Sequence, residues 1–278
     1  MTLKTRYATS PYEASLLGSQ DLRERYLITD LFSDGEPAFV YSHHDRMMIG
    51  GIAPGDASLR LRTPEELKVD YLLQRRELGI VNIGASGTVL ADGKRFELES
   101  REALYVSRGT QEVVFESETA SDSARFYLVS VPAHADHETR KISESEAEAT
   151  SMGSTERSNQ RTLRRYIHGG GAQSSQLMMG ITTLAAGSMW NTVPPHVHDR
   201  RSEIYLYFDL PKDERVLHLM GEPQETRHLI VGNEEAVISP SWSIHAGAGT
   251  VSYSFVWAMA GENYTFEDMD PVPMEEMR

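Results

Sequence analysis

Short runs of aliphatic, β-branched and aromatic residues recur along most of the chain, separated by polar or glycine-containing turns. From residue 80 these runs are closely spaced, and Asp92-Gly93 between two of them is a two-residue hairpin signal. Near the C-terminus, large apolar residues alternate with small or polar ones from Val251 to Met259, which is the period of a strand. The pattern predicts an all-β sandwich or barrel architecture with a few short helices, one of them at residues 21–27.

Composition restricts the class of protein and its partners. The chain has 278 residues, of which 40% are hydrophobic and 24% charged, as in a soluble globular protein with a sizeable core. A net charge of −14 argues against nucleic acid and anionic membranes as partners, because both are bound by basic patches. The chain has no cysteine, which excludes disulfides and thiolate metal sites and is consistent with a cytoplasmic protein. We see neither a signal peptide nor an apolar run long enough to span a bilayer.

A polar, charged stretch at residues 134–165 interrupts the strand pattern. We therefore predict an N-terminal domain at residues 1–140, a linker at 141–165 and a C-terminal domain at 166–278.

The two halves of the chain resemble a diverged duplication. Residues 102–109 can be aligned with 235–242, which places Glu112 opposite His245. Residues 75–77 resemble 200–203 if one residue is dropped. No H-x-H sequence precedes residue 75, so the N-terminal domain is expected to be a degenerate repeat without metal ligands, leaving one metal site per chain.

His196 and His198 stand at positions i and i+2, which point to the same side of a strand. Glu203 follows five residues later, at the start of an apolar run, and His245 ends the string Pro240-Ser241-Trp242-Ser243-Ile244-His245. The H-x-H pair alone could be accidental. Three histidines and a carboxylate on strands suit one divalent metal ion, and these ligand types accept zinc, iron, manganese or nickel.

This ligand pattern resembles that of the cupins, although Trp242 stands where many cupins have glycine. Longer strings resemble the 4-deoxy-L-threo-5-hexosulose-uronate ketol-isomerase family: Tyr41-Ser42-His43, Arg75-Arg76-Glu77-Leu78-Gly79, Trp190-Asn191-Thr192, Pro223-Gln224-Glu225-Thr226-Arg227-His228 and residues 238–245. The resemblance extends from about residue 20 to the C-terminus. It implies two fused cupin barrels (double-stranded β-helix, or jelly-roll), a cytoplasmic homohexamer, and one Zn²⁺ per chain held by His196, His198, Glu203 and His245.

The resemblance also implies a reaction in pectin degradation. The chain would convert 5-dehydro-4-deoxy-D-glucuronate into 3-deoxy-D-glycero-2,5-hexodiulosonate, an aldose–ketose isomerisation between C1 and C2. The metal ion would act as a Lewis acid that stabilises an enediolate.

Two further roles need side chains. A general base must move the proton, and Tyr205, Glu225 and His228 are candidates by their chemistry and their nearness in sequence to the ligands. The carboxylate of the small uronate substrate suits arginine, and the candidates are Arg200, Arg201 and Arg227, each of which could equally pair with a neighbouring acid. His218, in an apolar run, is expected to be a core histidine or a support of the site.

Three other functions remain open. A 5-deoxy-glucuronate isomerase of inositol breakdown would share the fold, but the strings above favour the pectin enzyme. A cupin dioxygenase could hold ferrous iron with the same ligands. A non-catalytic sugar-binding cupin is disfavoured, because a scaffold has no need of four spaced ligands.

Overall fold

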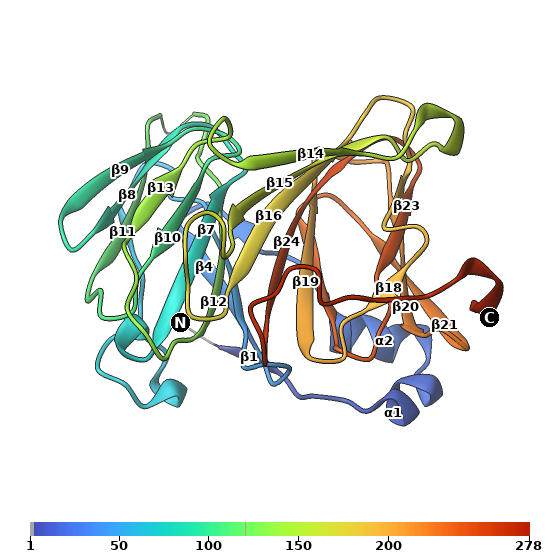
Figure 1. Ribbon diagram of the computed structural model, residues 1–278. Coiled ribbons are helices and arrows are strands. Elements are labelled where there is room, and N and C mark those ends of the chain that lie inside the picture. Colours follow the sequence, from blue (N-terminus) through green and yellow to red (C-terminus); the bar gives the residue numbers. More distant parts are fainter. Residues whose placement is uncertain (1–2, 120) are drawn as a thin grey trace. The chain divides into compact units, whose positions relative to one another are not determined.

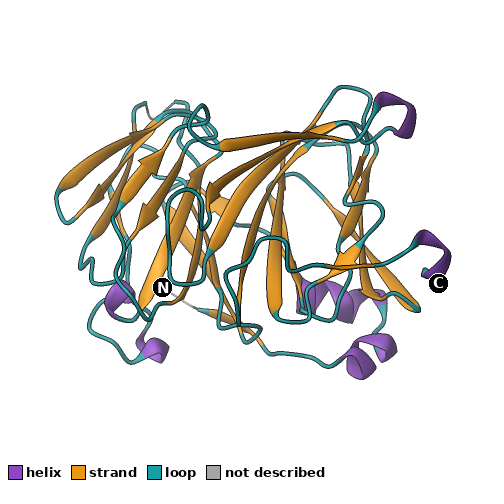
Figure 2. Cartoon of the chain, viewed as in Figure 1, coloured by secondary structure: helices purple, strands orange, loops and turns teal. Residues whose placement is uncertain are grey.

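The computed structural model describes residues 3–119 and 121–278 and consists mainly of strands with a few short helices (Figures 1 and 2). This confirms the predicted all-β class. The helices are α1 (Pro11–Leu16), α2 (Ser19–Tyr26) and the single-turn helices η1 (Glu65–Leu67), η2 (Leu72–Gln74), η3 (Thr155–Arg157) and η4 (Met274–Glu276). Helix α1 begins at a capping box in which the Ser10 side chain accepts from the Glu13 N–H and the Glu13 carboxylate accepts from the Ser10 N–H. Across the described residues, no helix combines the length and apolarity needed to cross a bilayer.

The chain divides into two compact units, and each unit is built from stretches that are separated in the sequence by parts of the other unit. The first contains residues up to Thr5, Asp30–Glu148 and Arg165–Met179; the second contains Arg6–Thr29, Ala149–Arg164 and Gly180–Arg278. This differs from the predicted domains 1–140 and 166–278, because residues 6–29 pack within the second unit and 165–179 within the first.

The predicted linker is also not a loop. It contains β14 (Glu148–Met152) and most of β15 (Arg161–Ile167). All of β14 is exposed, at the edge of its sheet. Its backbone can pair without burying side chains, and so its sequence lacks the apolar alternation of the other strands.

The strands assigned mainly to the first unit form two antiparallel sheets. The larger contains β1 (Lys4–Arg6), β4 (Glu36–Ser42), β5 (Met48–Ile52), β12 (Phe126–Pro132), β7 (Arg76–Asn82), β10 (Ala103–Val106) and β13 (Arg140–Ile142) in that spatial order, with β3 (Phe32–Ser33) paired to β4. The smaller contains β6 (Leu59–Arg60), β11 (Val113–Ser117), β8 (Gly87–Ala91) and β9 (Lys94–Leu98). Asp92 and Gly93 adopt positive φ values of 45° and 79° between β8 and β9, as the predicted hairpin turn requires.

The second unit repeats this plan. Its larger sheet has the order β14, β15, β16 (Met178–Leu184), β24 (Ser254–Gly261), β19 (Arg201–Phe208), β22 (Glu235–Ser239) and β2 (Leu27–Ile28). Its smaller sheet has the order β17 (Trp190–Asn191), β23 (Ala246–Gly249), β20 (Val216–Glu222) and β21 (Glu225–Val231). A separate pair joins β18 (His196–Val197) to β25 (Asp270–Pro271).

The central strands β7 and β19 show how the repeats correspond. Val106 of β10 pairs with Leu78, and Ser239 of β22 pairs with Glu203. The alignment of residues 102–109 with 235–242 makes Val106 equivalent to Ser239, so Leu78 occupies the position of Glu203. The predicted match of 75–77 to 200–203 with one residue dropped is therefore wrong, because strand pairing leaves no room for the gap.

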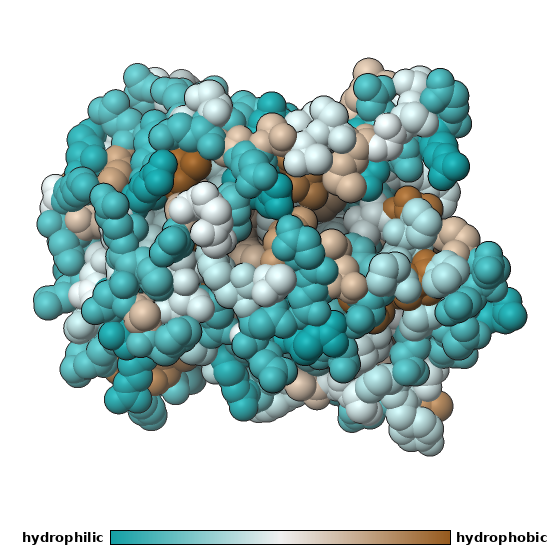
Figure 3. Space-filling model, in the orientation of Figure 1, coloured by the Kyte–Doolittle hydropathy of each residue, from teal (hydrophilic) through white to brown (hydrophobic). Residues whose placement is uncertain are grey.

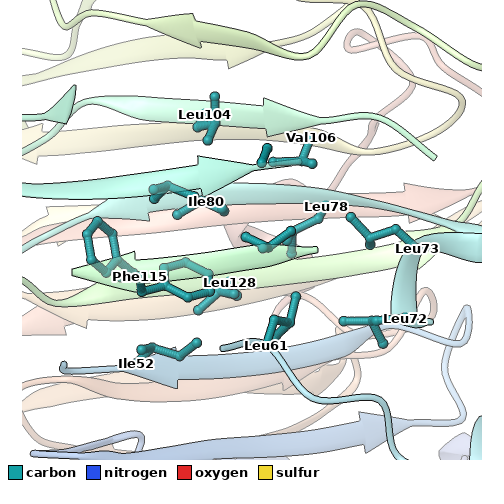
Figure 4. Packing of buried hydrophobic residues seen from close by; sticks show 14 of the residues in the cluster. Ile52, Leu61, Leu72, Leu73, Leu78, Ile80, Leu104, Val106, Phe115 and Leu128 are labelled. Atoms are coloured by element: carbon teal, nitrogen blue, oxygen red, sulfur yellow. The ribbon is translucent and has the colours of Figure 1, made fainter. Parts of the chain in front are cut away.

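The interior of the first unit is apolar where the second unit carries its polar side chains. Leu78 and Ile80 pack into a buried cluster with Leu104, Phe115 and Leu128 (Figure 4). Outside, the face seen in Figure 3 is mainly hydrophilic, with apolar side chains scattered over it. Among the described residues, the first unit has no group that matches the four expected ligands, and the apolar cluster fills its interior instead.

Candidate metal centre

Three imidazoles and one carboxylate converge in the second unit. The Nε2 atom of His196 lies 3.1 Å from Nε2 of His198 and 3.0 Å from Nε2 of His245. Oε2 of Glu203 lies 3.3 Å from the His198 nitrogen and 3.0 Å from the His245 nitrogen. Among the described residues, these four form the group whose ligand atoms lie close enough together, within 4.8 Å of one another, to hold a metal ion. The structure thus brings together all four predicted ligands.

The separations suit a single ion. Two ligand atoms that are each about 2.1 Å from one cation, at an angle of about 90–105°, are about 3.0–3.3 Å apart. Burial, together with His245 and His198, lowers the pKa of His196 to about 2, so its ring is neutral and offers a lone pair. Burial alone would raise the pKa of the Glu203 carboxyl, but His245 and His198 hold it well below its usual value. A neutral His196 ring and an ionised Glu203 carboxylate are the protonation states that binding of a divalent cation requires of these two ligands.

The C-terminal segment holds the H-x-H strand in place. His196 of β18 pairs with Pro271 of β25, and the backbone N–H of Val272 donates to Pro195 O. Figure 1 shows the red C-terminal tail passing β18. The carbonyl oxygen of Asp268 lies 2.9 Å from Nδ1 of His198 and accepts its N–H, which leaves Nε2 free to face the other ligands. No sequence pattern marks this tail as part of the site, because the decisive acceptor is a backbone oxygen.

Arg201 completes the support of His198. Its side chain is fully buried, and its Nη2 donates to Asp268 O at 2.6 Å and lies 3.1 Å from Nδ1 of His198. The guanidinium therefore fixes the carbonyl that orients the ligand. Arg201 is a positioning residue, and its predicted role as a carboxylate anchor is not supported by this placement.

We predict that Arg201→Met lowers metal affinity about 10- to 100-fold, the usual cost of losing a residue that orients a ligand. The measurement is competition for the metal ion against a chromogenic chelator, with Arg157→Met on the exposed helix η3 as the control. Unchanged affinity in the Arg201 variant would show that Asp268 O orients His198 without help.

The other two ligands are fixed by the sheets. Glu203 lies in the central strand β19, between β22 and β24, and its side chain is 4% exposed. His245 stands just before β23 and is 1% exposed, with Nδ1 3.3 Å from the Ser239 hydroxyl. Because Nδ1 faces the Ser239 hydroxyl, Nε2 of His245 is left to face the other ligands.

The three predicted base candidates lie in different places. Tyr205, two residues after Glu203 on β19, has its ring centroid 5.4 Å from that of His245, beside the site. His228 is exposed on β21 and pairs with Leu219, whose neighbours His218 and Met220 are buried, so His228 points out of the barrel. Glu225 is about half exposed and forms an ion pair with Arg227. Within the described residues, neither Glu225 nor His228 is bonded to the ligand set.

The two remaining arginine candidates have other partners. Arg200 contacts the Asp268 carboxylate through Nε at 2.8 Å and Nη2 at 2.5 Å, and Asp270 through Nη2 at 2.8 Å. Arg227 lies 2.6 Å from Glu225 and donates to the backbone oxygen of Ser15. The alternative prediction, that each arginine pairs with a neighbouring acid, therefore describes both Arg200 and Arg227.

Further polar side chains, those of Tyr207, His218 and Tyr253, lie next to the site along the inner face of β19. Burial raises the pKa of Tyr207 well above its usual value, so its hydroxyl stays protonated beside Nδ1 of His218 at 2.7 Å. His218 is fully buried, which agrees with both of its expected roles, a core histidine or a support of the site. A Cβ added at Gly247 would lie 3.1 Å from the hydroxyls of both Tyr207 and Tyr253, so glycine makes room for them.

Comparison with known proteins adds a family likeness to this geometry. A model of the KduI/IolB family matches residues 26–272. A curated relative from Halalkalibacterium halodurans, named 4-deoxy-L-threo-5-hexosulose-uronate ketol-isomerase, is 51% identical over 276 residues, which cover 99% of this chain and 100% of the relative.

Solved structures support the fold. An IolB-like protein from Salmonella typhimurium has a TM-score of 0.72 at 17% identity, covering 89% of this chain and 96% of that one. Oxalate decarboxylase from Bacillus subtilis has a TM-score of 0.54 at 11% identity, covering 79% and 70%. These likenesses, with the repeated pair of sheets, confirm the cupin-like fold.

Proposed function

Because the chain belongs to the KduI/IolB family, we infer that it is a ketol-isomerase acting on 4-deoxy-L-threo-5-hexosulose uronate, also called 5-dehydro-4-deoxy-D-glucuronate. The product is 3-deoxy-D-glycero-2,5-hexodiulosonate. The observation that carries this inference is 51% identity over nearly the full length of both chains to a relative of that name. The cluster of three histidines and one glutamate supplies the site that such a reaction needs.

The isomerisation moves one hydrogen between neighbouring carbons. A proton leaves C2, the C1 carbonyl becomes part of an enediol, and protonation at C1 with loss of the O2 proton produces the C2 ketone. A divalent ion held by His196, His198, Glu203 and His245 supplies Lewis acidity when bound. Tyr205 is the one base candidate beside these ligands, and burial raises the pKa of its hydroxyl well above the usual value. We propose that the neutral Tyr205 hydroxyl donates a hydrogen bond to a substrate oxygen.

We further propose zinc as the ion, following the family resemblance, although the ligand types also suit iron, manganese and nickel. The 5-deoxy-glucuronate isomerase alternative is not favoured, since curated relatives 51% and 48% identical over nearly the full length are named 4-deoxy-L-threo-5-hexosulose-uronate ketol-isomerase. The cytoplasmic location and the hexameric assembly that the resemblance implies stay predictions, and light scattering of the purified chain tests the assembly.

Metal removal tests the function directly. We predict that the purified chain converts the 4-deoxy-5-ketouronate, that chelation reduces turnover to background, and that Zn²⁺ restores it. The rate should be the same without oxygen, since the isomerisation is redox-neutral. Full activity in metal-free protein would refute the metal-assisted reaction, and an oxygen requirement would favour the dioxygenase alternative. Absence of conversion by the metal-loaded wild type would refute the proposed substrate.

A further inference from the structure

An arginine that the sequence patterns did not single out lies on the inner face of the second unit. Arg161 begins β15, which neighbours β16, which in turn neighbours β24. The N–H of Ala185 donates to Gln160 O at 2.9 Å, and the N–H of Leu184 donates to Tyr253 O at 3.0 Å. Arg161, Leu184 and Tyr253 therefore follow one another across three strands, and cross-strand neighbours share a face of the sheet.

That face is the one that carries the metal ligands. Glu203, Tyr205 and Tyr207 alternate along β19 and so point to one side. The Tyr207 ring centroid is 5.5 Å from that of Tyr253 and 5.9 Å from that of Phe255. Tyr253, and with it Arg161, belongs to the same interior as Glu203.

Arg161 differs from the other candidate arginines in its partners. Its Nη1 donates to Asn159 O at 2.8 Å, and no acid in the described chain forms an ion pair with it. Burial lowers its pKa, while Tyr205 and Tyr253 act in the opposite direction, which places its charge near both hydroxyls. A partly buried guanidinium without a carboxylate partner is costly unless an anion binds there.

A second polar group lies in the same row. The Tyr253 hydroxyl belongs to a residue only 2% exposed and has no hydrogen-bond partner among the residues described. A phenol O–H and a guanidinium together offer the donors that a carboxylate accepts. Ring contacts connect Tyr253 to the metal ligands: the Tyr253 centroid is 6.3 Å from that of Phe255, Phe255 stacks on Tyr205 at 4.7 Å, and Tyr205 is 5.4 Å from His245.

We propose that Arg161 and the Tyr253 hydroxyl bind the substrate carboxylate while the other end of the substrate faces His196, His198, Glu203 and His245. This assignment rests on the proposed function, which supplies a substrate with a carboxylate at one end and the reacting carbonyl at the other. Arg161 then selects uronates over neutral sugars, and Tyr205 lies along the carbon chain between the two ends.

The test uses Arg161→Gln and Arg161→Lys, with Arg157→Gln as the matched control, because Arg157 is an exposed arginine four residues away on η3. Two probes are compared: the 4-deoxy-5-ketouronate, and its analogue in which the carboxylate is replaced by CH₂OH. Loss of a charged hydrogen bond predicts a rise of about 10- to 100-fold in KM for the uronate in R161Q, with the lysine variant intermediate. In R161Q, KM for the neutral analogue, metal content and Tm should stay at wild-type values. Tyr253→Phe should raise KM for the uronate but not for the neutral analogue, and by a smaller factor than R161Q does.

Equal loss on both probes, or a KM for R161Q equal to that of R157Q, would overturn the assignment. Wild-type turnover tests the proposed function separately, since it does not depend on the variants. If the wild type bound but did not convert the uronate, calorimetric binding of the uronate to wild type and R161Q would still decide the role of Arg161.

Discussion

His198→Ala is expected to abolish metal binding and lower turnover by about 10³-fold or more, because Lewis-acid stabilisation contributes several kcal/mol to such a reaction. Neighbouring groups contact both ring nitrogens of His198. Its Nε2 lies 3.1 Å from that of His196 and 3.3 Å from the Glu203 carboxylate, and its Nδ1 is fixed by Asp268 O. Metal content by mass spectrometry and turnover of the ketouronate are measured on the same samples.

The matched control is His228→Ala. His228 is exposed and points away from the barrel interior, so its loss should leave metal content and turnover at wild-type levels. The control also tests His228 as a predicted base, a role that its exposed position disfavours. Full metal occupancy in His198→Ala would contradict the ligand assignment, and a large loss in His228→Ala would return that residue to the list of catalytic candidates.

The ligands could be predicted because the metal demands few residue types, and because strand parity puts i and i+2 on one face. The residues that position them left no such signal. Asp268 acts through its backbone oxygen, which every residue has, and Arg161 reaches the inner face only through the pairing of β15, β16 and β24. Arg200 and Arg227 matched the chemistry of a carboxylate anchor equally well, and only the structure shows their acid partners.

The division into domains was harder to predict, since hydropathy reports burial and not which barrel a strand joins. Residues 6–29 place the short strand β2 beside β22, where Leu27 pairs with Val237. The exposed β14 has the composition of a linker. The repeat itself could be predicted, but its register could not, because adjacent polar residues such as Arg76 and Glu77 allow a shift of one position that only the pairing resolves.

Glu77 shows what this corrected register means for stability. In the shifted alignment it was the counterpart of the ligand Glu203, but it occupies the position of Ser202 and points to the other face of its sheet. It is fully buried within the first unit. Its carboxylate accepts the Tyr105 hydroxyl at 2.8 Å and the backbone N–H groups of Ser175, Gln176 and Leu177 at 2.7, 2.9 and 2.9 Å.

Glu77→Leu is therefore expected to destabilise the protein by about 3–5 kcal/mol, because removing one acceptor leaves four buried donors unsatisfied. Tm should fall by roughly 10 °C, with a smaller fall for Glu77→Gln, whose amide oxygen still accepts but whose NH₂ opposes a donor. Glu112→Gln is the control: the Glu112 side chain is 42% exposed and pairs with Arg60, and its change should shift Tm by less than about 2 °C. Metal content of the folded Glu77 variants should remain at the wild-type level, since all four ligands lie in the second unit. A Tm for Glu77→Leu within that margin of wild type would contradict the role assigned to Glu77.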